Sequence, residues 1–414
     1  METVTSKPEV VLHNDDCLAV LRTLPDNSVH AVITDPPYGL SDLPAGKVAE
    51  ALTRWLSGDT EYIPDGKGMM GHEWDRFVPP PAVWAECLRV LKPGGHLAVF
   101  AGTRTVDLMA MSLRLAGAEI RDQLSWINGS GMPKSLNVEK ALAKQEDVDS
   151  SSWKGFGTGL KPSTEPIVLA RKPLDKTVAN TIRKHGTGAL NIDASRVPAA
   201  GGRPRRVGDY KDTDNHTYSG RMDGSLKGGS KAEGVTTEGR WPANILLDPS
   251  AAQIMDDQRG IRTSGKAKEG GHTRNTPPGE GVYGGGKDFW SKSVDAGTLY
   301  GDSGGVSRYF NVMEPDAVGG VPSTFIYASK APRSERPEYV HEDGERVWHS
   351  TVKPLTVMRW LCTLICPPGG TVLEPFAGSG TTVEAAVLGG FNVIGIEEND
   401  RYIPLIEQRL ERVR

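Results

Sequence analysis

One short stretch combines residue types that could do chemistry at the end of a strand. Residues 31–40 read AVITDPPYGL, in which apolar or small residues are followed by an acid, two prolines and a tyrosine. Prolines end a strand because each lacks an N–H and has a fixed φ, and their carbonyl oxygens remain as rigid acceptors. The stretch therefore brings a carboxylate, a fixed carbonyl and an aromatic face to the edge of an open α/β sheet where ligands bind. The residues concerned are Asp35, Pro36, Pro37 and Tyr38.

A second stretch has the features of a nucleoside-type cofactor site. EPFAGSGTT at residues 374–382 follows a predicted strand and opens a predicted helix, and its glycines allow a tight turn and the close approach of a ligand. It lacks the third glycine of a dinucleotide site and the lysine of a phosphate-binding loop. Glu397 ends the next predicted strand, about 20 residues on, where an acid commonly binds a ribose hydroxyl. We therefore expect S-adenosylmethionine, bound by Phe376, Ala377, Gly378, Ser379, Gly380, Thr381 and Glu397.

The elements that position these residues form an α/β pattern. Strand-like and helix-like segments alternate over about the first 170 residues, which predicts a largely parallel sheet with helices on its faces. After the acidic strand the chain supplies only one more helix, so the next strand of the cofactor unit must come from EVVLHNDD at residues 9–16. This predicts a circularly permuted fold in which Asp16 reaches an adenine amino group, although an N-cap role for Asp15 and Asp16 stays open. The expected order of strand ends along one edge is Phe376–Gly380, Glu397, Asp16 and Asp35.

The composition limits the class of protein. The chain has 414 residues, 37% of them hydrophobic, and a formal net charge of −4. No apolar run approaches the roughly 20 residues of a membrane span, and the first residues contain no signal-peptide core. Cysteines are few, and Cys362 and Cys366 are expected in the core rather than at a metal. We therefore expect a protein of the reducing cytoplasm that binds neither membrane nor metal.

A basic, glycine-rich stretch separates the two motifs. Residues 171–231 contain 13 Lys or Arg against 6 Asp or Glu, and residues 201–305 contain 22 of the 49 glycines. Such segments bury little surface on their own, and their charge suits either contacts to phosphates or a solvated loop. The predicted organisation is two catalytic parts at 1–175 and 321–414, separated by a partly flexible insertion at 176–320.

The motifs in this order resemble the beta class of DNA amino-methyltransferases, in which Asp-Pro-Pro-Tyr precedes Phe-x-Gly-x-Gly. The similar stretches, some of them typical of phage- and prophage-encoded members, are NDDCLAVL, TDPPYGL (34–40), INGSGMPKSLNV (127–138), GTGLKPSTEPIVLARKP (157–173), HSTVKPLTVMRWL (349–361) and EPFAGSGTT (374–382). The resemblance covers residues 9–175 and about 320–414. The chain departs from the family pattern at Ser350, where relatives have proline, and at Glu398, where they often have a basic or polar residue.

The resemblance implies a permuted Rossmann-like methyltransferase fold with a large glycine-rich insertion, and site-specific methylation of DNA from S-adenosylmethionine. Asp35 and the Pro36 carbonyl would accept the hydrogens of an exocyclic amine, while Tyr38 would stack on the flipped base. The cofactor's methionine carboxylate would lie near His349, Thr351 and Lys353, unless this loop binds no ligand. An aspartate in the first motif favours adenine N6, with cytosine N4 as the nearest alternative. Methylation of RNA or of a protein amide, and an inactive DNA-binding module, are more remote.

The resemblance also implies partners. Double-stranded DNA would be read by the insertion at 176–320, with Arg203, Arg205 and Arg206 as phosphate contacts. Relatives often dimerise, so a homodimer stays open. No stretch resembles a nuclease motif, which favours a solitary methyltransferase over a fused restriction–modification enzyme. We expect it in the cytoplasm, that of the host cell if a phage encodes it.

Overall fold

The computed structural model covers most of the chain. It describes residues 7–40, 44–68, 73–129, 135–145, 148–197, 205–209, 231–236, 239–263, 303–313, 331 and 333–413. The chain divides into two compact units, of which the first comprises Met1–Ser195, Ala243–Ile254 and Phe310–Arg414. The second comprises Arg196–Pro242 and Met255–Tyr309. Both ends of the predicted insertion at 176–320 thus belong to the first unit, and the role of the insertion stays a prediction.

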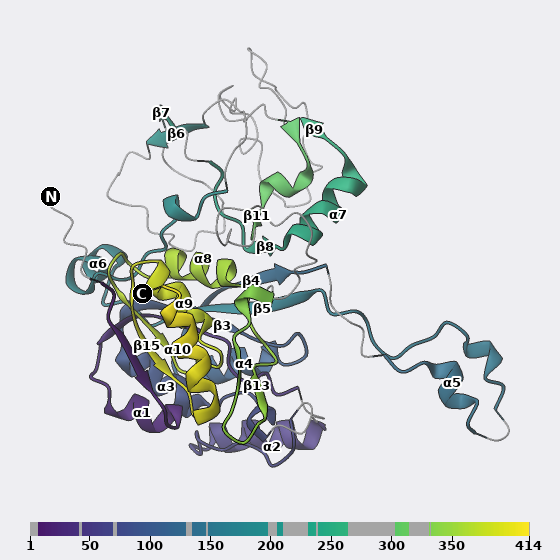
Figure 1. The fold of residues 1–414 in the computed structure, drawn as a ribbon. Coiled ribbons are helices and arrows are strands. Elements are labelled where there is room, and N and C mark those ends of the chain that lie inside the picture. Colours follow the sequence, from purple (N-terminus) through teal and green to yellow (C-terminus); the bar gives the residue numbers. More distant parts are fainter. Residues whose placement is uncertain are drawn as a thin grey trace. The chain divides into compact units, whose positions relative to one another are not determined.

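A mixed sheet forms the centre of the first unit (Figure 1). Within the described residues its strands follow the order β1 (Val10–His13), β15 (Asn392–Ile396), β14 (Thr371–Glu374), β2 (Val29–Thr34), β3 (Leu91–Phe100), β5 (Thr164–Arg171), β4 (Glu119–Ile127), β8 (Ile245–Leu247) and β11 (Asn311–Val312). The pairs from β1 to β3 are parallel, and β5 runs antiparallel to both β3 and β4. The start of β5 therefore lies beside the end of β3.

The strand pairing confirms the predicted circular permutation. β14, from the end of the chain, pairs with β2 through Val372 and Ala31, and β15 pairs with β1 through Val393 and Val10. All four strands are parallel, so their carboxyl ends meet at one edge, as predicted. The predicted order along that edge is wrong, because β1 lies outside β15 and the glycine-turn strand β14 is the neighbour of β2. The first motif thus lies beside the glycine turn, where the order of the strands reverses and ligands bind in this class of sheet.

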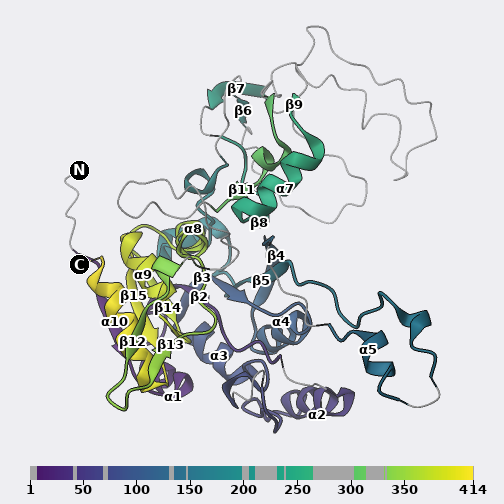
Figure 2. The ribbon, with the colours of Figure 1, turned by 45° about the vertical axis from the view of Figure 1, so that its right-hand side comes forward.

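Helices cover both faces of this sheet (Figure 2). Side chains of α8 (Leu355–Ile365), α9 (Thr381–Leu388) and α10 (Ile403–Glu411) share one core with Ala31 and Ile33 of β2. Val32, between them, belongs to the core on the other face with α1 (Cys17–Thr23), α2 (Ala45–Leu56), α3 (Pro81–Val90) and α4 (Val106–Leu115). Successive strand residues point to opposite faces, so the continuous apolar run of β2 fills both layers.

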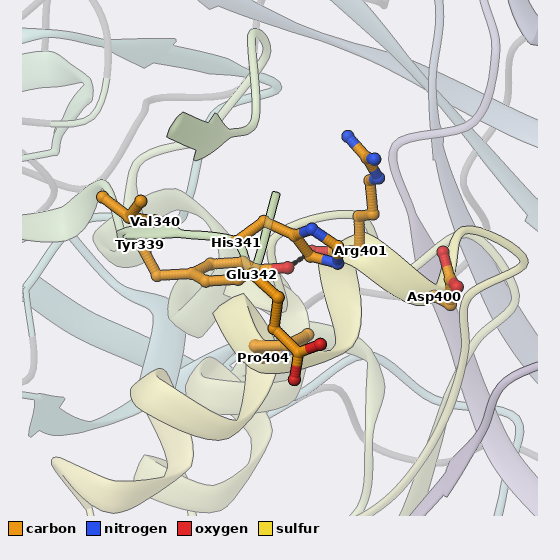
Figure 3. Close-up of a pocket in the computed structure, with 7 residues that line it drawn as sticks. All are labelled: Tyr339, Val340, His341, Glu342, Asp400, Arg401 and Pro404. Atoms are coloured by element: carbon orange, nitrogen blue, oxygen red, sulfur yellow. Dashed lines mark hydrogen bonds between the residues drawn. The ribbon is translucent and has the colours of Figure 1, made fainter. Parts of the chain in front are cut away.

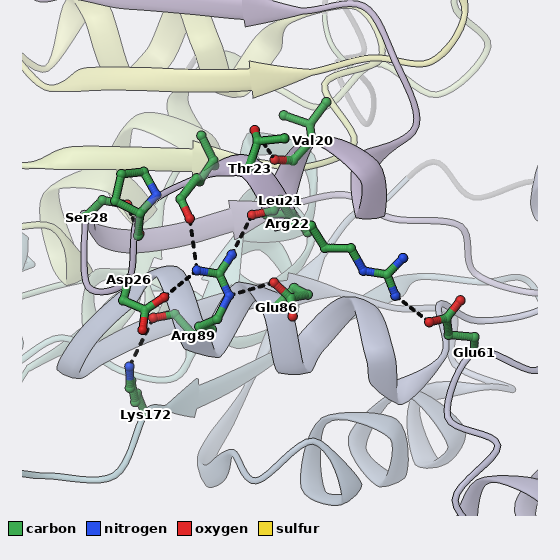
Figure 4. A network of polar contacts seen from close by, with 12 residues as sticks. Val20, Leu21, Arg22, Thr23, Asp26, Ser28, Glu61, Glu86, Arg89 and Lys172 are labelled. Carbon is green, nitrogen blue, oxygen red and sulfur yellow. Dashed lines mark hydrogen bonds and ion pairs between the residues drawn. The ribbon is translucent and has the colours of Figure 1, made fainter.

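One arginine fixes the connection between α1 and β2 (Figure 4). The Arg89 guanidinium, from α3, donates to the carbonyl oxygens of Leu21 and Leu24 at 2.7 and 2.9 Å. It also bonds Asp26 at 2.5 Å and Glu86 at 2.7 Å. Because the last carbonyls of a helix have no partner within the helix, Arg89 satisfies the end of α1 and holds the chain that enters β2.

The described residues form further elements in both units. The helices are α5 (Val138–Leu142), α6 (Val178–His185) and α7 (Pro249–Arg259). Three antiparallel pairs of strands are β6 (Arg205–Asp209) with β7 (Lys231–Thr236), β9 (Arg262–Thr263) with β10 (Ser303–Gly304), and β12 (Glu338–Val340) with β13 (Arg346–Trp348). The short 3₁₀ turns are η2 (Glu73–Asp75), η3 (Ser151–Trp153), η4 (Asp193–Ser195), η5 (Val306–Tyr309), η7 (Arg333–Glu335) and η8 (Asp400–Tyr402). None of the helices in the described part of the chain is long and apolar enough to span a membrane.

Both cysteines of the α8 region are buried in the core, Cys362 completely and Cys366 with 2% of its surface exposed. Burial raises the pKa of Cys366 to about 12. The prediction that these two cysteines pack in the core is therefore confirmed.

Candidate active site

The acid of the first motif lies in a cluster of polar side chains at the end of β2. Asp35 accepts a hydrogen bond from the Tyr38 hydroxyl on Oδ1 at 2.7 Å. Its other oxygen, Oδ2, is 2.5 Å from Nζ of Lys353, in the loop before α8. The fold thus brings together two residues that are 318 positions apart in the chain. Lys353, which the sequence placed beside the cofactor, forms an ion pair with Asp35, the predicted catalytic acid.

A second acid, Glu165, completes this cluster and was not predicted. Its Oε2 is 3.1 Å from the Tyr38 hydroxyl and 3.4 Å from Nζ of Lys353. Glu165 is the second residue of β5, and because β5 is antiparallel, its beginning reaches the edge where the parallel strands end. The one signal in the sequence is an acid directly before the apolar run PIVLA.

The cluster combines a buried ammonium with two partly exposed acids, since the side chains of Asp35 and Glu165 are 17% and 31% exposed. Lys353 is 7% exposed, and its ammonium lies 5.3 Å from the ring centre of Tyr38 and 5.1 Å from that of Phe100. Burial lowers the pKa of Lys353, but the charges of Asp35 and Glu165 outweigh burial and leave this pKa above its ordinary value. Burial and the same two acids raise the pKa of Tyr38 well above its ordinary value. Lys353 is therefore charged and Tyr38 is a proton donor at neutral pH.

Two further residues fix the backbone of the motif. One carboxylate oxygen of buried Asp75 accepts from the backbone N–H groups of Tyr38 and Gly39, both at 2.9 Å. The Thr105 hydroxyl donates to the Tyr38 carbonyl at 2.6 Å. Gly39 has φ +64°, and a Cβ there would lie 2.9 Å from the backbone of Phe77. These contacts hold the turn that contains buried Pro36 and half-buried Pro37, and none of them was predicted.

The glycine turn after β14 is held by the acid that the sequence assigned to the cofactor. Glu397 accepts from the backbone N–H of Gly378 at 2.7 Å and from that of Asn399 at 2.9 Å. Gly378 and Gly380 have φ values of +53° and +80°, which favour glycine. Burial raises the pKa of Glu397 to about 7, against the effect of these hydrogen bonds. The glycine turn and Glu397, which the sequence assigned to one site, are therefore in direct contact.

The other residues predicted in this turn form its frame. The Phe376 ring contacts Trp84 edge-on at 6.4 Å between centroids. The Ala377 N–H donates to the end of β15, at the Ile396 carbonyl, at 2.8 Å. The hydroxyls of Ser379 and Thr381, both buried, lie 3.4 Å apart where α9 begins.

A buried glutamate links the two motifs. Glu374, the last residue of β14, accepts from the hydroxyls of Thr34 and Thr382, both at 2.5 Å, and from the Phe376 N–H at 3.0 Å. Thr34 immediately precedes Asp35, so this one carboxyl ties the end of β2 to the glycine turn. Burial raises the pKa of Glu374 to about 8, although its hydrogen bonds act in the opposite direction. The sequence shows Glu374 at the start of EPFAGSGTT, but it could not predict the contact with Thr34, because that contact depends on the pairing of β14 with β2.

The remaining predicted cofactor residues lie on the same edge. The exposed Asp16 is the N-cap of α1, accepting from the Ala19 N–H at 2.8 Å, so its N-cap role is confirmed and its adenine role stays a prediction. The His349 ring packs against Tyr402 at 4.8 Å, and a Cβ added to Gly378 would lie 3.1 Å from its Nε2. Thr351 is exposed and donates its backbone N–H to His349 Nδ1 at 3.3 Å. His349 thus borders the glycine turn.

The predicted DNA contacts lie outside the part of the chain whose side chains the structure describes. Arg203 lies outside the described residues, and Arg205 and Arg206 lie in β6, of which only the backbone is described. Their role as phosphate contacts stays a prediction.

A surface hollow of about 390 Å³ lies elsewhere on the first unit (Figure 3). It is lined by Tyr339, Val340, His341, Glu342, Asp400, Arg401 and Pro404. The Tyr339 hydroxyl donates to the Arg401 carbonyl at 3.0 Å, which holds the β12–β13 hairpin against the segment before α10. This hollow contains none of the predicted site residues.

The permuted mixed sheet, with an acid-bound glycine turn beside a second motif at its reversal point, defines a Rossmann-like α/β protein. The chain belongs to the DNA methylase family of N6 and N4 methyltransferases, whose model matches residues 29–408. This confirms the family predicted from the motifs.

Individual relatives match over shorter stretches. Type II methyltransferase M.HindIII of Haemophilus influenzae is 28% identical over 199 residues, which cover 44% of this chain and 64% of that protein. DNA adenine methyltransferase YhdJ of Escherichia coli K12 is 38% identical over 76 residues, 18% of this chain and 25% of YhdJ. The matched stretches thus span less than two thirds of these relatives.

Solved structures align over most of the chain at low similarity. The complex of M1.HpyAVI with SAM has a TM-score of 0.36 at 12% identity, covering 97% of this chain and 99% of that one. The cytosine-N4-specific PvuII DNA methyltransferase has a TM-score of 0.40 at 10% identity, covering 98% and 89%. Scores this low carry no weight for function.

Proposed function

We propose that this protein is a site-specific DNA methyltransferase that transfers a methyl group from S-adenosylmethionine to adenine N6. One observation carries the proposal: β14 pairs with β2, so the glycine turn and the Asp35 motif end side by side at one sheet edge. Membership of the DNA methylase family supports the same reading.

The residues of the turn fit this cofactor. Each Glu397 oxygen accepts one backbone N–H, and a carboxylate has about four acceptor sites, so both oxygens can still bind ribose hydroxyls. A Cβ on Gly378 would lie 3.1 Å from His349 Nε2 and one on Gly380 2.9 Å from Ile406, so the turn can pack this closely only with glycine at both positions. S-adenosylmethionine, when bound, supplies an electrophilic methyl group on a sulfonium centre. Asp16 and the loop with His349 would bind its adenine and methionine ends.

The motif after β2 supplies the acceptors that an exocyclic amine needs. The lone pair of such an amine is delocalised into the ring, and it becomes available when both hydrogens are held by acceptors. Asp35 and the Pro36 carbonyl would hold them, and the negative charge of Asp35 would stabilise the positive charge that develops on nitrogen. Tyr38, whose backbone is fixed by Asp75 and Thr105, would stack on the flipped base.

Adenine N6 is favoured over cytosine N4 by the aspartate at position 35, since relatives with serine there more often act on cytosine. The relative YhdJ is named as a DNA adenine methyltransferase. Cytosine N4 remains the second candidate, because the same acceptors suit both amines.

The test is incubation of the protein with duplex DNA and methyl-labelled S-adenosylmethionine, followed by mass analysis of the nucleosides. N6-methyladenine is the expected product. N4-methylcytosine would replace the adenine assignment, and a duplex that stays unmethylated would overturn the function itself. Sequencing of host DNA for modified bases after expression would then give the recognition site.

Recognition of double-stranded DNA by the insertion at 176–320 is part of the proposal. Replacement of Arg203, Arg205 and Arg206 together by glutamine should weaken DNA binding and reduce its salt dependence, since phosphate contacts release counterions. Unchanged binding across a salt series would remove these arginines from the interface. Chromatography with light scattering would decide whether the active species is a homodimer.

A further inference from the structure

In the proposed reaction, on which this inference rests, Asp35 must face the target amine as a free negative charge. In the structure each of its oxygens already binds a donor from this chain, Tyr38 on Oδ1 and Lys353 on Oδ2. A carboxylate has further acceptor sites, so hydrogen bonding alone would not exclude the amine. The charge is the larger obstacle, because an ammonium 2.5 Å from Asp35 cancels the field that should stabilise a cationic nitrogen.

Glu165 lies where it can remove this obstacle. Its Oε2 faces the same two donors, at 3.1 Å from the Tyr38 hydroxyl and 3.4 Å from the Lys353 ammonium. The cluster contains two carboxylates and one ammonium, so one negative charge always remains, and the position of the ammonium decides which acid carries it. The Tyr38 hydroxyl has one proton and serves one of the two acids at a time.

We propose that Glu165 is a positioning residue that takes the Lys353 ammonium and the Tyr38 hydroxyl from Asp35 when the target amine arrives. Nζ of Lys353 lies 2.5 Å from Asp35 and 3.4 Å from Glu165, so it already lies between the two acids. A shift toward Glu165 brings it into close contact with that acid, and a further rotation of its flexible side chain takes it out of contact with Asp35. The exchange leaves Asp35 charged beside the amine and keeps the buried ammonium paired. Glu165 acts through the two residues that it contacts, Tyr38 and Lys353.

The alternative is a purely structural role, in which Glu165 only compensates the buried charge of Lys353. Its loss would then lower thermal stability and reduce the amount of folded protein, while the folded fraction would react at the normal rate. The two roles differ in the rate of a single turnover, measured with DNA and cofactor both saturating, and in the dependence of that rate on Lys353.

The experiment compares wild type, Glu165→Gln, Lys353→Met and the double variant in single-turnover methylation of duplex DNA. Glutamine keeps the volume of Glu165 and removes its charge, so the rate should fall about 10- to 100-fold, the range of strongly coupled charged residues. The dissociation constant for S-adenosylmethionine, measured by calorimetry, should stay within about twofold. In the Lys353→Met background the same change should cost less than about threefold, because no ammonium is left to transfer.

Glu119→Gln is the matched control, since Glu119 lies on β4 and pairs with Arg171 at the other end of β5. It should leave the single-turnover rate unchanged. A Glu165→Gln enzyme with the wild-type rate, or an equal loss with and without Lys353, would overturn the inference and leave the proposed function standing. A wild-type protein that methylates no duplex DNA would overturn both.

Discussion

At the end of β2, Asp35 contacts the side chains of Tyr38, from its own motif, and of Lys353, from a distant loop. At the end of β14, the backbone of the glycine turn instead contacts a carboxylate from the next strand. Lys353 reaches Asp35 across 318 residues of sequence, and Glu165 reaches Tyr38 across 127. Gly378 bonds Glu397, only 19 residues away. The first site depends on charge interactions between side chains, and the second on the conformation of a glycine backbone bound by one carboxylate.

This difference predicts that the two sites fail in different ways. A preorganised charge acts most strongly where new charge develops, so changes at Asp35 should affect the rate of the chemical step. A close-fitting turn acts on a bound ligand in its ground state, so changes at Gly378 should affect affinity. Variants at either site test whether rate and affinity are separable at this edge.

Asp35→Asn should give the largest effect. The amide keeps the shape but removes the negative charge beside the target amine, so single-turnover methylation should fall about 10³-fold. Cofactor affinity by calorimetry should change little. Asp122→Asn, an exposed acid on β4, is the control for a loss of charge elsewhere. A comparable loss of cofactor affinity in Asp35→Asn would contradict the separation of the two sites.

Tyr38→Ala should rank second. Loss of base stacking costs roughly 1–3 kcal/mol, which corresponds to a fall of about 5- to 150-fold in kcat/KM for DNA. Tyr38→Phe keeps the ring and removes the hydroxyl that bonds Asp35 at 2.7 Å, so it should lose less. A duplex with 2-aminopurine at the target position reports flipping by fluorescence. If the two variants lose equally, the hydroxyl and not the ring is the important group.

The same contrast explains what the sequence could predict. The glycine turn, Glu397 and the Asp-Pro-Pro-Tyr corner are local patterns, and the alternation of elements indicated a permuted parallel sheet. The sequence predicted β1 as the neighbour of β2, and the structure has β14 there. The prediction failed because nothing in apolar strands such as HAVIT and TVLE indicates which strand each one pairs with. Strand pairing is set by helix packing on both faces, which depends on the whole chain.

The missed residues have one physical feature in common. Glu165, Glu374 and Asp75 act through contacts that exist only after strands and loops from different parts of the chain meet. Glu165 is informative only once β5 is known to be antiparallel, since in a parallel strand its first residues would lie at the opposite edge. A single sequence therefore shows the motifs but not the side chains that tune them.

Gly378→Ala tests the shape-based site. At φ +53° a side chain costs about 1–2 kcal/mol, and the added Cβ would lie 3.1 Å from His349 Nε2. Affinity for S-adenosylmethionine should fall at least about tenfold, with a smaller effect on the rate at saturation. Gly390→Ala is the matched control, because its φ of +75° imposes similar strain while a Cβ there meets open space. If Gly378→Ala and Gly390→Ala lost the same affinity for S-adenosylmethionine, backbone strain alone would explain the effect.

The pH dependence of cofactor binding should give the smallest effect. Burial raises the pKa of Glu397 to about 7, so the carboxyl ionises between pH 6 and 8 in the free protein. In folding terms the raised pKa stabilises the protonated native state at low pH, and this contribution is lost as pH rises through about 7. Ribose hydroxyls donate to the ionised form, so binding should tighten about threefold from pH 6.5 to 7.5.

Calorimetry in buffers of different ionisation enthalpy measures this linkage directly, because cofactor binding should release a fraction of a proton near pH 7. Glu397→Gln should bind more weakly and with no such dependence. Glu398→Gln, the exposed neighbour, should keep the dependence but shift it to lower pH, because the charge of Glu398 contributes to the raised pKa of Glu397. Glu374, with a pKa of about 8, is fully hydrogen-bonded within the protein and remains in both variants. A pH dependence that persists in Glu397→Gln would therefore transfer the titration from the turn to Glu374, the residue that joins the turn to the Asp35 corner.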